Sequence, residues 1–232
     1  PVFHDDQHGT AIVVLAGLIN SLKLANKNKS EVKIIVNGAG AAGISITKLL
    51  LFYGIKNIIV CDSKGAIFEG RKENMNSVKK EISKLTNKNN IKGKLEDVIK
   101  KVDVFIGIST ANVLSKQMIK SMNNKPIIFA MANPNPEIMP KDAEDAGAFI
   151  VATGRSDFSN QINNVLAFPG IFRGLLDSRS KDITEEIKVI VAEAIANFVT
   201  KIYVDKIVPN VLERNLAQQV AKVIINYKKE NK

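Results

Sequence analysis

Short apolar runs alternate with stretches of helical periodicity through most of the chain. The apolar runs predict five strands, at 32–37, 58–61, 102–106, 127–130 and 149–151. The periodic stretches between them predict helices at 10–25, 42–53, 76–86, 115–122 and 141–146. Because most of these strands lie far enough apart for a helical crossover, the pattern favours an α/β protein with a doubly wound parallel sheet.

The last third of the chain turns helical. Helices are predicted at 182–202, where Asp182 and Glu185 have the spacing of a capping box, and at 213–228, after the break at Pro209. No internal repeat and no linker-like tract interrupts the chain. We therefore predict one domain over residues 1–232, with an N-terminal helix at about 10–25 and C-terminal helices within about 182–228.

Composition is that of a globular protein, with 45% hydrophobic and 24% charged residues over 232 positions. No apolar run reaches the length of a bilayer span and no segment resembles a signal peptide, so we expect no membrane partner. Cys61 is the single cysteine, which excludes an internal disulfide framework and suits a reducing, cytoplasmic location.

The net charge of +10 is the first sign of nucleic-acid binding, but the distribution argues against it. The lysines are spread over helix faces and loops within 23–33, 79–101 and 222–232, and aromatic residues make up only 6% of the chain. We expect no nucleic-acid partner, and a general attraction for anionic substrates instead.

The first predicted strand runs into a glycine-rich turn that opens a helix, which is the context a dinucleotide-binding fingerprint requires. The turn consists of Gly38, Ala39, Gly40, Ala41, Ala42 and Gly43. The first glycine would allow the tight turn, the second the approach of a pyrophosphate, and the third close packing of helix on strand. Backbone amides of the turn would then bind phosphate at the positive end of the helix. The motif predicts a Rossmann-like fold. The alternative for the motif is a glycine-rich turn that binds no ligand.

Two further positions lie where strands end. Asp62 follows the second strand, about twenty residues past the glycines, where an acid accepts hydrogen bonds from the ribose of NAD and repels the extra phosphate of NADP. Lys64 and Arg71 could each reach a 2′-phosphate, so NADP stays an alternative. Ser109 lies in a small-residue loop after the third strand, which would leave room for a dinucleotide.

Amides and acids are grouped at three other places. Asn133 stands in the double-proline loop Asn-Pro-Asn-Pro, and Asn163 with Asn164 in a long polar segment. Asp5 and Asp6 come directly before the first helix, where one could bind a hard cation while the other orients it. The alternative for the acidic pair is capping of that helix.

Together these motifs resemble the malic enzymes, and the resemblance runs through essentially the whole chain. It rests on Asp-Asp-x-x-Gly-Thr at the front, the glycine turn, the Asn-Pro-x-Pro loop and Asn-Asn-x-x-x-Phe-Pro-Gly, which occur in the order of the family. By resemblance, Asp6 would bind Mg²⁺ or Mn²⁺, and Asn133, Asn163 and Asn164 would contact malate or the nicotinamide end of the cofactor.

The resemblance implies oxidative decarboxylation of malate to pyruvate and carbon dioxide with NAD, or NADP in its place. The catalytic Tyr and Lys of the family, and a paired Glu-Asp of its metal site, lie in an N-terminal region that would precede this sequence, so no residue here is named as catalytic. We expect that N-terminal catalytic domain as a partner within the same protein, assembly into a homo-oligomer, and NAD binding without efficient malate turnover by this chain alone. Two alternatives are the cofactor domain of an amino-acid dehydrogenase and a non-catalytic nucleotide-sensing module.

Overall fold

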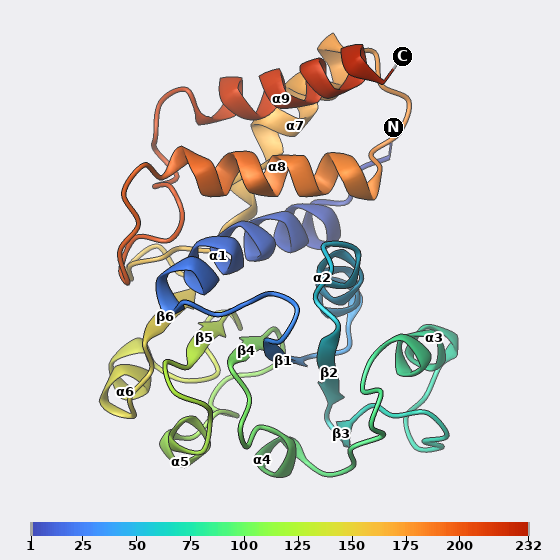
Figure 1. The fold of residues 1–232 in the computed structure, drawn as a ribbon, viewed down its shortest axis with the longest axis vertical. Coiled ribbons are helices and arrows are strands. Elements are labelled where there is room, and N and C mark those ends of the chain that lie inside the picture. The colour runs from blue at the N-terminus through green and yellow to red at the C-terminus, as the bar shows by residue number, and fades with distance from the viewer. Residues whose placement is uncertain (1, 232) are drawn as a thin grey trace.

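A six-stranded sheet with helices on both faces forms the centre of the protein, in a computed structural model that describes residues 2–231 (Figure 1). The strands are β1 (Lys33–Asn37), β2 (Asn57–Asp62), β3 (Gly65–Ala66), β4 (Val104–Gly107), β5 (Ile127–Ala130) and β6 (Ile150–Thr153). Their order across the sheet is β3-β2-β1-β4-β5-β6, and every pair is parallel except β2 with β3. The Rossmann-like fold and the five predicted strands are confirmed.

The edge strand β3 was not predicted. It is only two residues long and returns antiparallel to β2 directly after Asp62, pairing Asp62 with Gly65. Gly65 has a φ of +97°, which an L side chain adopts only with strain. A pairing this short leaves no alternation of apolar and polar residues for a sequence pattern to show.

Helices cover the sheet on both sides. They are the π-helical turn η1 (Asp5–Gly9), α1 (Thr10–Ala25), α2 (Ala41–Phe52), α3 (Ser77–Leu85), α4 (Leu95–Val98), α5 (Lys116–Lys120), α6 (Pro140–Asp145), the 3₁₀ turn η2 (Asn164–Leu166), α7 (Phe168–Asp177), α8 (Glu185–Phe198) and α9 (Leu216–Glu230). All seven predicted helices occur, with ends shifted by a few residues. The short elements η1, α4 and η2 and the helix α7 are additions.

One predicted cap is wrong. The side chain of Thr184, not of Asp182, caps α8, because its Oγ1 accepts a hydrogen bond from the backbone N–H of Ile187 at 3.4 Å. From the capping-box spacing of Asp182 and Glu185 we predicted a helix start at residue 182, three residues before the observed start at Glu185. The acids Glu185 and Glu186 still lie in the first turn, where the helix dipole favours negative charge.

Two hydrophobic clusters hold the layers together, one on each face of the sheet. The larger joins α1, α2 and the C-terminal helices to the sheet, and the smaller lies under α4, α5 and α6. Figure 1 shows α1 and α8 stacked between the sheet and α9. By length and composition alone the helical segment 5–25 could cross a membrane, contrary to the reading of the sequence, but 78% of its apolar window is buried inside the protein. We therefore assign it to the core.

The carboxyl ends of the five parallel strands lie in one row. Strand register pairs Asn37 with both Cys61 and Gly107, then Gly107 with Ala130, and Ala130 with Thr153. The loops that follow these residues therefore leave the sheet at one edge. Chain order reverses between β1 and β4, and open α/β sheets bind ligands at such a point.

Candidate cofactor site

The glycine turn between β1 and α2 has the shape that its sequence predicts. Gly38 has a φ of +133°, and a Cβ there would overlap the carbonyl of Ile108. A Cβ on Gly43 would overlap the carbonyl oxygen of Gly38, so this glycine lets α2 pack tightly against the turn. Gly40 differs, because a Cβ there would meet no atom within 4 Å. Gly38 and Gly43 are thus required by the fold, whereas Gly40 faces open space.

Gly40 is also the N-cap of α2, and within residues 2–231 no side-chain hydrogen bond caps the start of this helix. The amides of Ala41 and Ala42 are therefore available to an anion at the positive end of the helix dipole. A cleft of about 540 Å³ lies beside the turn, within the usual size range of ligand pockets. Its wall includes Gly40 of the turn, the strand ends Asn37 of β1 and Asp62 of β2, and Ser109 after β4.

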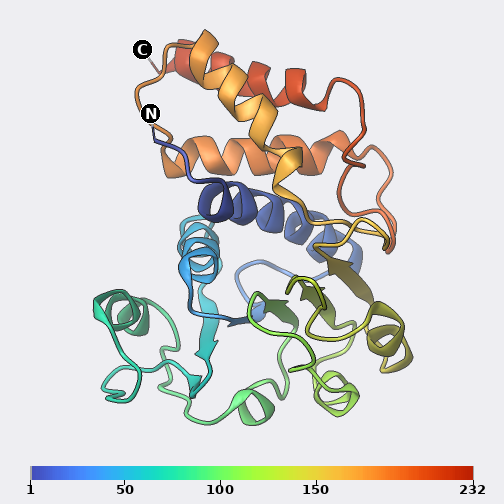
Figure 2. The same cartoon turned by 180° about the vertical axis from the view of Figure 1, so that it is seen from behind.

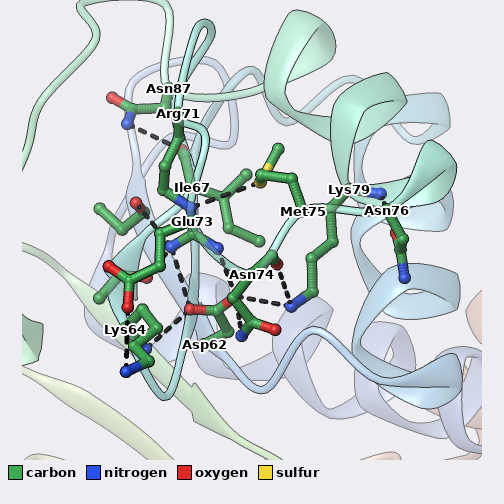
Figure 3. Close-up of polar contacts among 12 residues, drawn as sticks. Asp62, Lys64, Ile67, Arg71, Glu73, Asn74, Met75, Asn76, Lys79 and Asn87 are labelled. Atoms are coloured by element: carbon green, nitrogen blue, oxygen red, sulfur yellow. Dashed lines mark hydrogen bonds and ion pairs between the residues drawn. The ribbon is translucent and has the colours of Figure 1, made fainter.

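Asp62 lies at the centre of a polar cluster beside this cleft (Figure 3). Its carboxylate accepts hydrogen bonds from both Nη atoms of Arg71, from Nζ of Lys79 at 2.6 Å and from Nδ2 of Asn74 at 3.1 Å. The backbone N–H of Lys64 adds another at 2.9 Å. These donors fill about the four lone-pair positions that a carboxylate offers.

The ion pairs of Asp62 are buried. The side chains of Asp62, Arg71 and Lys79 are only 7%, 6% and 12% exposed. Burial by itself would raise the pKa of Asp62, but the hydrogen bonds from Arg71 and Lys79 outweigh it and lower the pKa to about 2. The carboxylate is ionised at neutral pH, and the two cations leave the cluster with a net positive charge.

Ser109 is held at the rim of the cleft by two contacts. Its hydroxyl accepts a hydrogen bond from Nδ2 of Asn37 at 2.9 Å, and its backbone N–H donates to Oε1 of Glu137 at 3.0 Å. The other oxygen of Glu137 accepts from the N–H of Ala132 at 3.0 Å. The fully buried Glu137 thus ties the loop after β4 to the loop after β5. Burial raises its pKa, although the two amides act in the opposite direction.

The front acidic pair and the asparagine pair meet in space. Nδ2 of Asn164 donates to Oδ2 of Asp5 at 2.7 Å, across 159 positions of sequence. The other oxygen, Oδ1 of Asp5, is buried without a hydrogen-bond partner among the described residues. Asp6 is exposed. An unpartnered buried carboxylate oxygen suits a site completed by a cation, but residues 2–231 contain no group of three metal-ligating side chains.

The remaining candidates are placed less tightly. Asn163 uses its side chain to cap η2, since its Oδ1 accepts from the N–H of Val165 at 2.9 Å. Asn133 is exposed in its proline loop and lies beside Gly154. Arg155, which follows β6 and is not one of the candidates, pairs with Asp157 at 2.7 Å and donates to the carbonyl of Pro134 at 3.0 Å, as a surface contact between two loops. Among the described residues, no hydrogen bond joins Asn133 to Asn164 or to the acidic pair, where the bond runs from Asn164 to Asp5.

Two features of the site were not anticipated from the sequence. Glu137, directly after the proline loop, was given no role from the sequence, although an acid in an otherwise apolar and proline-rich stretch was a usable signal. A second cleft, of about 510 Å³, lies on the other side of Gly40 and is lined by His8 of η1 and Lys188 of α8. Burial, and then the charge of Lys188, lower the pKa of His8. Nothing in the pattern of α8 distinguishes the buried Lys188 from the other polar residues of that helix.

Comparison with known proteins gives one consistent family. A sequence model described as "Malic enzyme, NAD binding domain" matches residues 7–229. The bifunctional malic/malolactic enzyme of Bacillus subtilis is 58% identical over 97% of this chain and 55% of its own length. The NADP-dependent malic enzyme of Haemophilus influenzae is 50% identical over 85% of this chain and 26% of its own length.

Among solved structures, the NAD-dependent malic enzyme of Thermotoga maritima superimposes with a TM-score of 0.94 at 46% identity, over 97% of this chain and 59% of that one. The chain thus spans about half the length, or less, of the relatives it matches. This agreement supports the malic enzyme interpretation over an amino-acid dehydrogenase or a nucleotide sensor. The chain belongs to the malic enzyme family, in the region that the family model describes as the NAD-binding domain.

Proposed function

We propose that this chain, as one domain over residues 1–232, is the cofactor-binding part of an enzyme that oxidises malate and decarboxylates it to pyruvate and carbon dioxide. The observation that carries the proposal is the glycine turn. It presents free helix amides beside a cleft of about 540 Å³ at the switch point of the sheet, in a chain of the malic enzyme family. The nicotinamide cofactor, when bound, supplies the hydride acceptor.

The residues of the turn would bind the diphosphate of the cofactor. The amides of Ala39, Ala41 and Ala42, with Gly40 facing the open side, form a neutral binding surface that needs no basic side chain. Asp62 would face the adenosine ribose and Ser109 the middle of the cofactor, since both line the same cleft. Asn133, exposed beside Gly154, would reach the nicotinamide end.

We propose NAD as the preferred cofactor, with NADP accepted less well. The Asp62 carboxylate favours ribose hydroxyls over a 2′-phosphate. It is already surrounded by donors, so a ribose hydroxyl would have to replace one of them, most easily the neutral amide of Asn74 at 3.1 Å. Because Arg71 and Lys79 leave the cluster positive, a 2′-phosphate would not meet an uncompensated negative charge. The preference for NAD should therefore be modest.

We propose that Asp6 binds Mg²⁺ or Mn²⁺ and that Asp5 orients the site through its hydrogen bond to Asn164. The donors are hard carboxylate oxygens, which suit these ions, and the remaining ligands would come from water, substrate and another part of the protein. A divalent ion in such a site supplies Lewis-acid polarisation of a carbonyl. Asn163 and Asn164 would hold the substrate carboxylates by donating amide hydrogens.

We propose that the general acid and base lie outside this chain, in a catalytic domain on its N-terminal side. Tyr53, the tyrosine nearest the glycine turn in sequence, lies at the far end of α2, with Nζ of Lys29 4.2 Å from the centre of its ring. That is the end opposite the phosphate-binding amides. We also propose that the protein is cytoplasmic, in keeping with its single cysteine, Cys61, which is buried and unpaired. We propose further that it forms a homo-oligomer and binds neither nucleic acid nor a membrane.

The test is turnover of malate by the complete protein with Mg²⁺ or Mn²⁺, comparing NAD with NADP and identifying the product as pyruvate. Product analysis should include lactate, because one relative is named a malic/malolactic enzyme. The 232-residue chain alone should bind NAD without efficient turnover. Metal-dependent malate oxidation by that chain alone would contradict the proposed division of labour.

A further inference from the structure

The apolar surface of α7 is wider than the face that packs inward. The inward face packs against α9, with Gly170 and Gly174 lying so close to Val220 and Ile224 that a Cβ on either glycine would crowd them. The rest of the apolar surface of such a helix is normally covered as well. Figure 2 shows α7, in light orange, crossing in front of the other C-terminal helices.

The outer face is exposed. Phe168, Phe172 and Leu176 repeat every four residues along one face of α7 and are 39%, 42% and 69% exposed, and Val165 of the preceding turn η2 is 47% exposed. Single exposed apolar residues are ordinary, but three along one helix face form a patch. The pair Arg173–Asp177, at 2.6 Å, runs beside it as a polar border, which resembles the rim of a protein interface. We call these four residues the α7 stripe.

The stripe continues into the first residues of the described chain. The ring of Phe3 lies 5.9 Å from that of Phe168 and 5.7 Å edge-on from that of Phe172, and the two rings of α7 are 4.7 Å apart. Val2, next to them, is 88% exposed. Asp5, with its unpartnered carboxylate oxygen, follows two residues after Phe3. The patch and the incomplete acidic site are therefore neighbours.

We propose that the α7 stripe is the docking surface of the additional domain that complete malic enzymes carry, and that the docked domain lies beside Asp5 and Asp6. The relatives are about twice the length of this chain or longer, so such a domain exists in them. A polypeptide continuing before residue 2 would leave the structure at Phe3, inside the patch, which raises its effective concentration there. The inference rests on the proposed function only in taking that domain to complete the metal site.

The test is hydroxyl-radical footprinting of the complete enzyme, which labels exposed leucines without any mutation. Leu176 and Leu212 form a matched pair, with exposures of 69% and 87% in this structure, so an uncovered stripe would label them almost equally. Docking predicts labelling of Leu176 at least about fivefold slower than that of Leu212, with Phe168 and Phe172 protected as well. Near-equal rates would overturn the proposal.

The same sample identifies the occupant. Labelling repeated after dilution to the monomer should leave Leu176 protected, because the docked domain belongs to the same polypeptide. Release of protection on dilution would overturn the proposal in favour of a second copy of the chain. Malate turnover and NAD affinity, measured on the unlabelled enzyme, report the proposed function separately. A protected stripe in an enzyme inactive on malate would leave the docking inference standing and remove the proposed function.

Discussion

Replacing Gly40 by Ala should weaken cofactor binding without harming the fold. Gly40 has φ −80° and ψ −174°, which alanine adopts readily, and its added Cβ would meet no protein atom within 4 Å. Reduced freedom of the unfolded chain would stabilise the variant by about 0.4–1 kcal/mol, while alanine is a poorer N-cap by a similar amount. We expect the free energy of unfolding to change by less than about 1 kcal/mol.

Gly43 provides the matched contrast, since it stands three residues further in the same turn. A Cβ at Gly43 would overlap the carbonyl oxygen of Gly38, and backbone atoms cannot move aside as flexible side chains do. Gly43→Ala should therefore destabilise the protein by about 3 kcal/mol, at the upper end of overpacking costs. Because the same substitution is made at both glycines, a difference in stability between the two variants tests the geometry of the turn.

Urea denaturation measures the stability of both variants, and calorimetric titration measures their affinity for NAD. Because the diphosphate must approach the backbone where the Gly40 side chain would stand, Gly40→Ala should weaken NAD binding at least tenfold, or about 1.4 kcal/mol. If Gly40→Ala binds NAD as tightly as the unaltered protein, the diphosphate does not lie over this turn.

Other predictions concern the charged residues of the site. Asp62→Asn leaves the buried Arg71 and Lys79 uncompensated and should lower the free energy of unfolding by about 3–5 kcal/mol in urea denaturation; a change below 1 kcal/mol would contradict the buried ion pairs. Since the pKa of Asp62 falls from 3.8 to about 2 on folding, its ionised form should contribute about 2 kcal/mol above pH 4, lost as the pH falls from 4 to 2. Asp62→Asn should lack this part of the acid dependence, and an unchanged slope would assign it elsewhere. Lys79→Met should weaken the binding of NADP more than that of NAD in calorimetric titration. Equal losses of affinity would show that Lys79 does not lie beside the 2′-phosphate. In the complete enzyme, Asn164→Ala should lower the affinity for Mn²⁺ by about 10–100-fold, because Asp5 loses its hydrogen-bond partner. An unchanged affinity would place the ion away from Asp5 and Asn164.

Local patterns were sufficient for the five parallel strands and for the shape of the glycine turn. The runs of apolar residues are long enough to mark β1, β2, β4, β5 and β6, and the glycine turn identifies itself by its place between a strand and a helix. Once the strands are parallel, their register brings Gly38, Asp62 and Ser109 to one edge. Their common cleft therefore follows from topology that the sequence already predicts.

Contacts between distant segments could not be read in this way. Asp5 meets Asn164 across 159 positions, and Lys188 of α8 lines a cleft beside the glycine turn only because the last third of the chain folds back. The helix α7 was missed although its apolar residues keep a helical period, because Pro169, Gly170 and Gly174 look like helix breakers. The two glycines are instead what permits its packing on α9.

The most direct test of the account is a crystal structure of the complete enzyme with NAD and Mn²⁺. We predict the diphosphate within about 2.7–3.2 Å of the amides of Ala41 and Ala42, the adenosine ribose beside Asp62, and the ion on Asp6. Two results would contradict the account. One is a cofactor bound elsewhere, with the cleft beside Gly40 filled by side chains, and the other is Asp6 turned away from the ion.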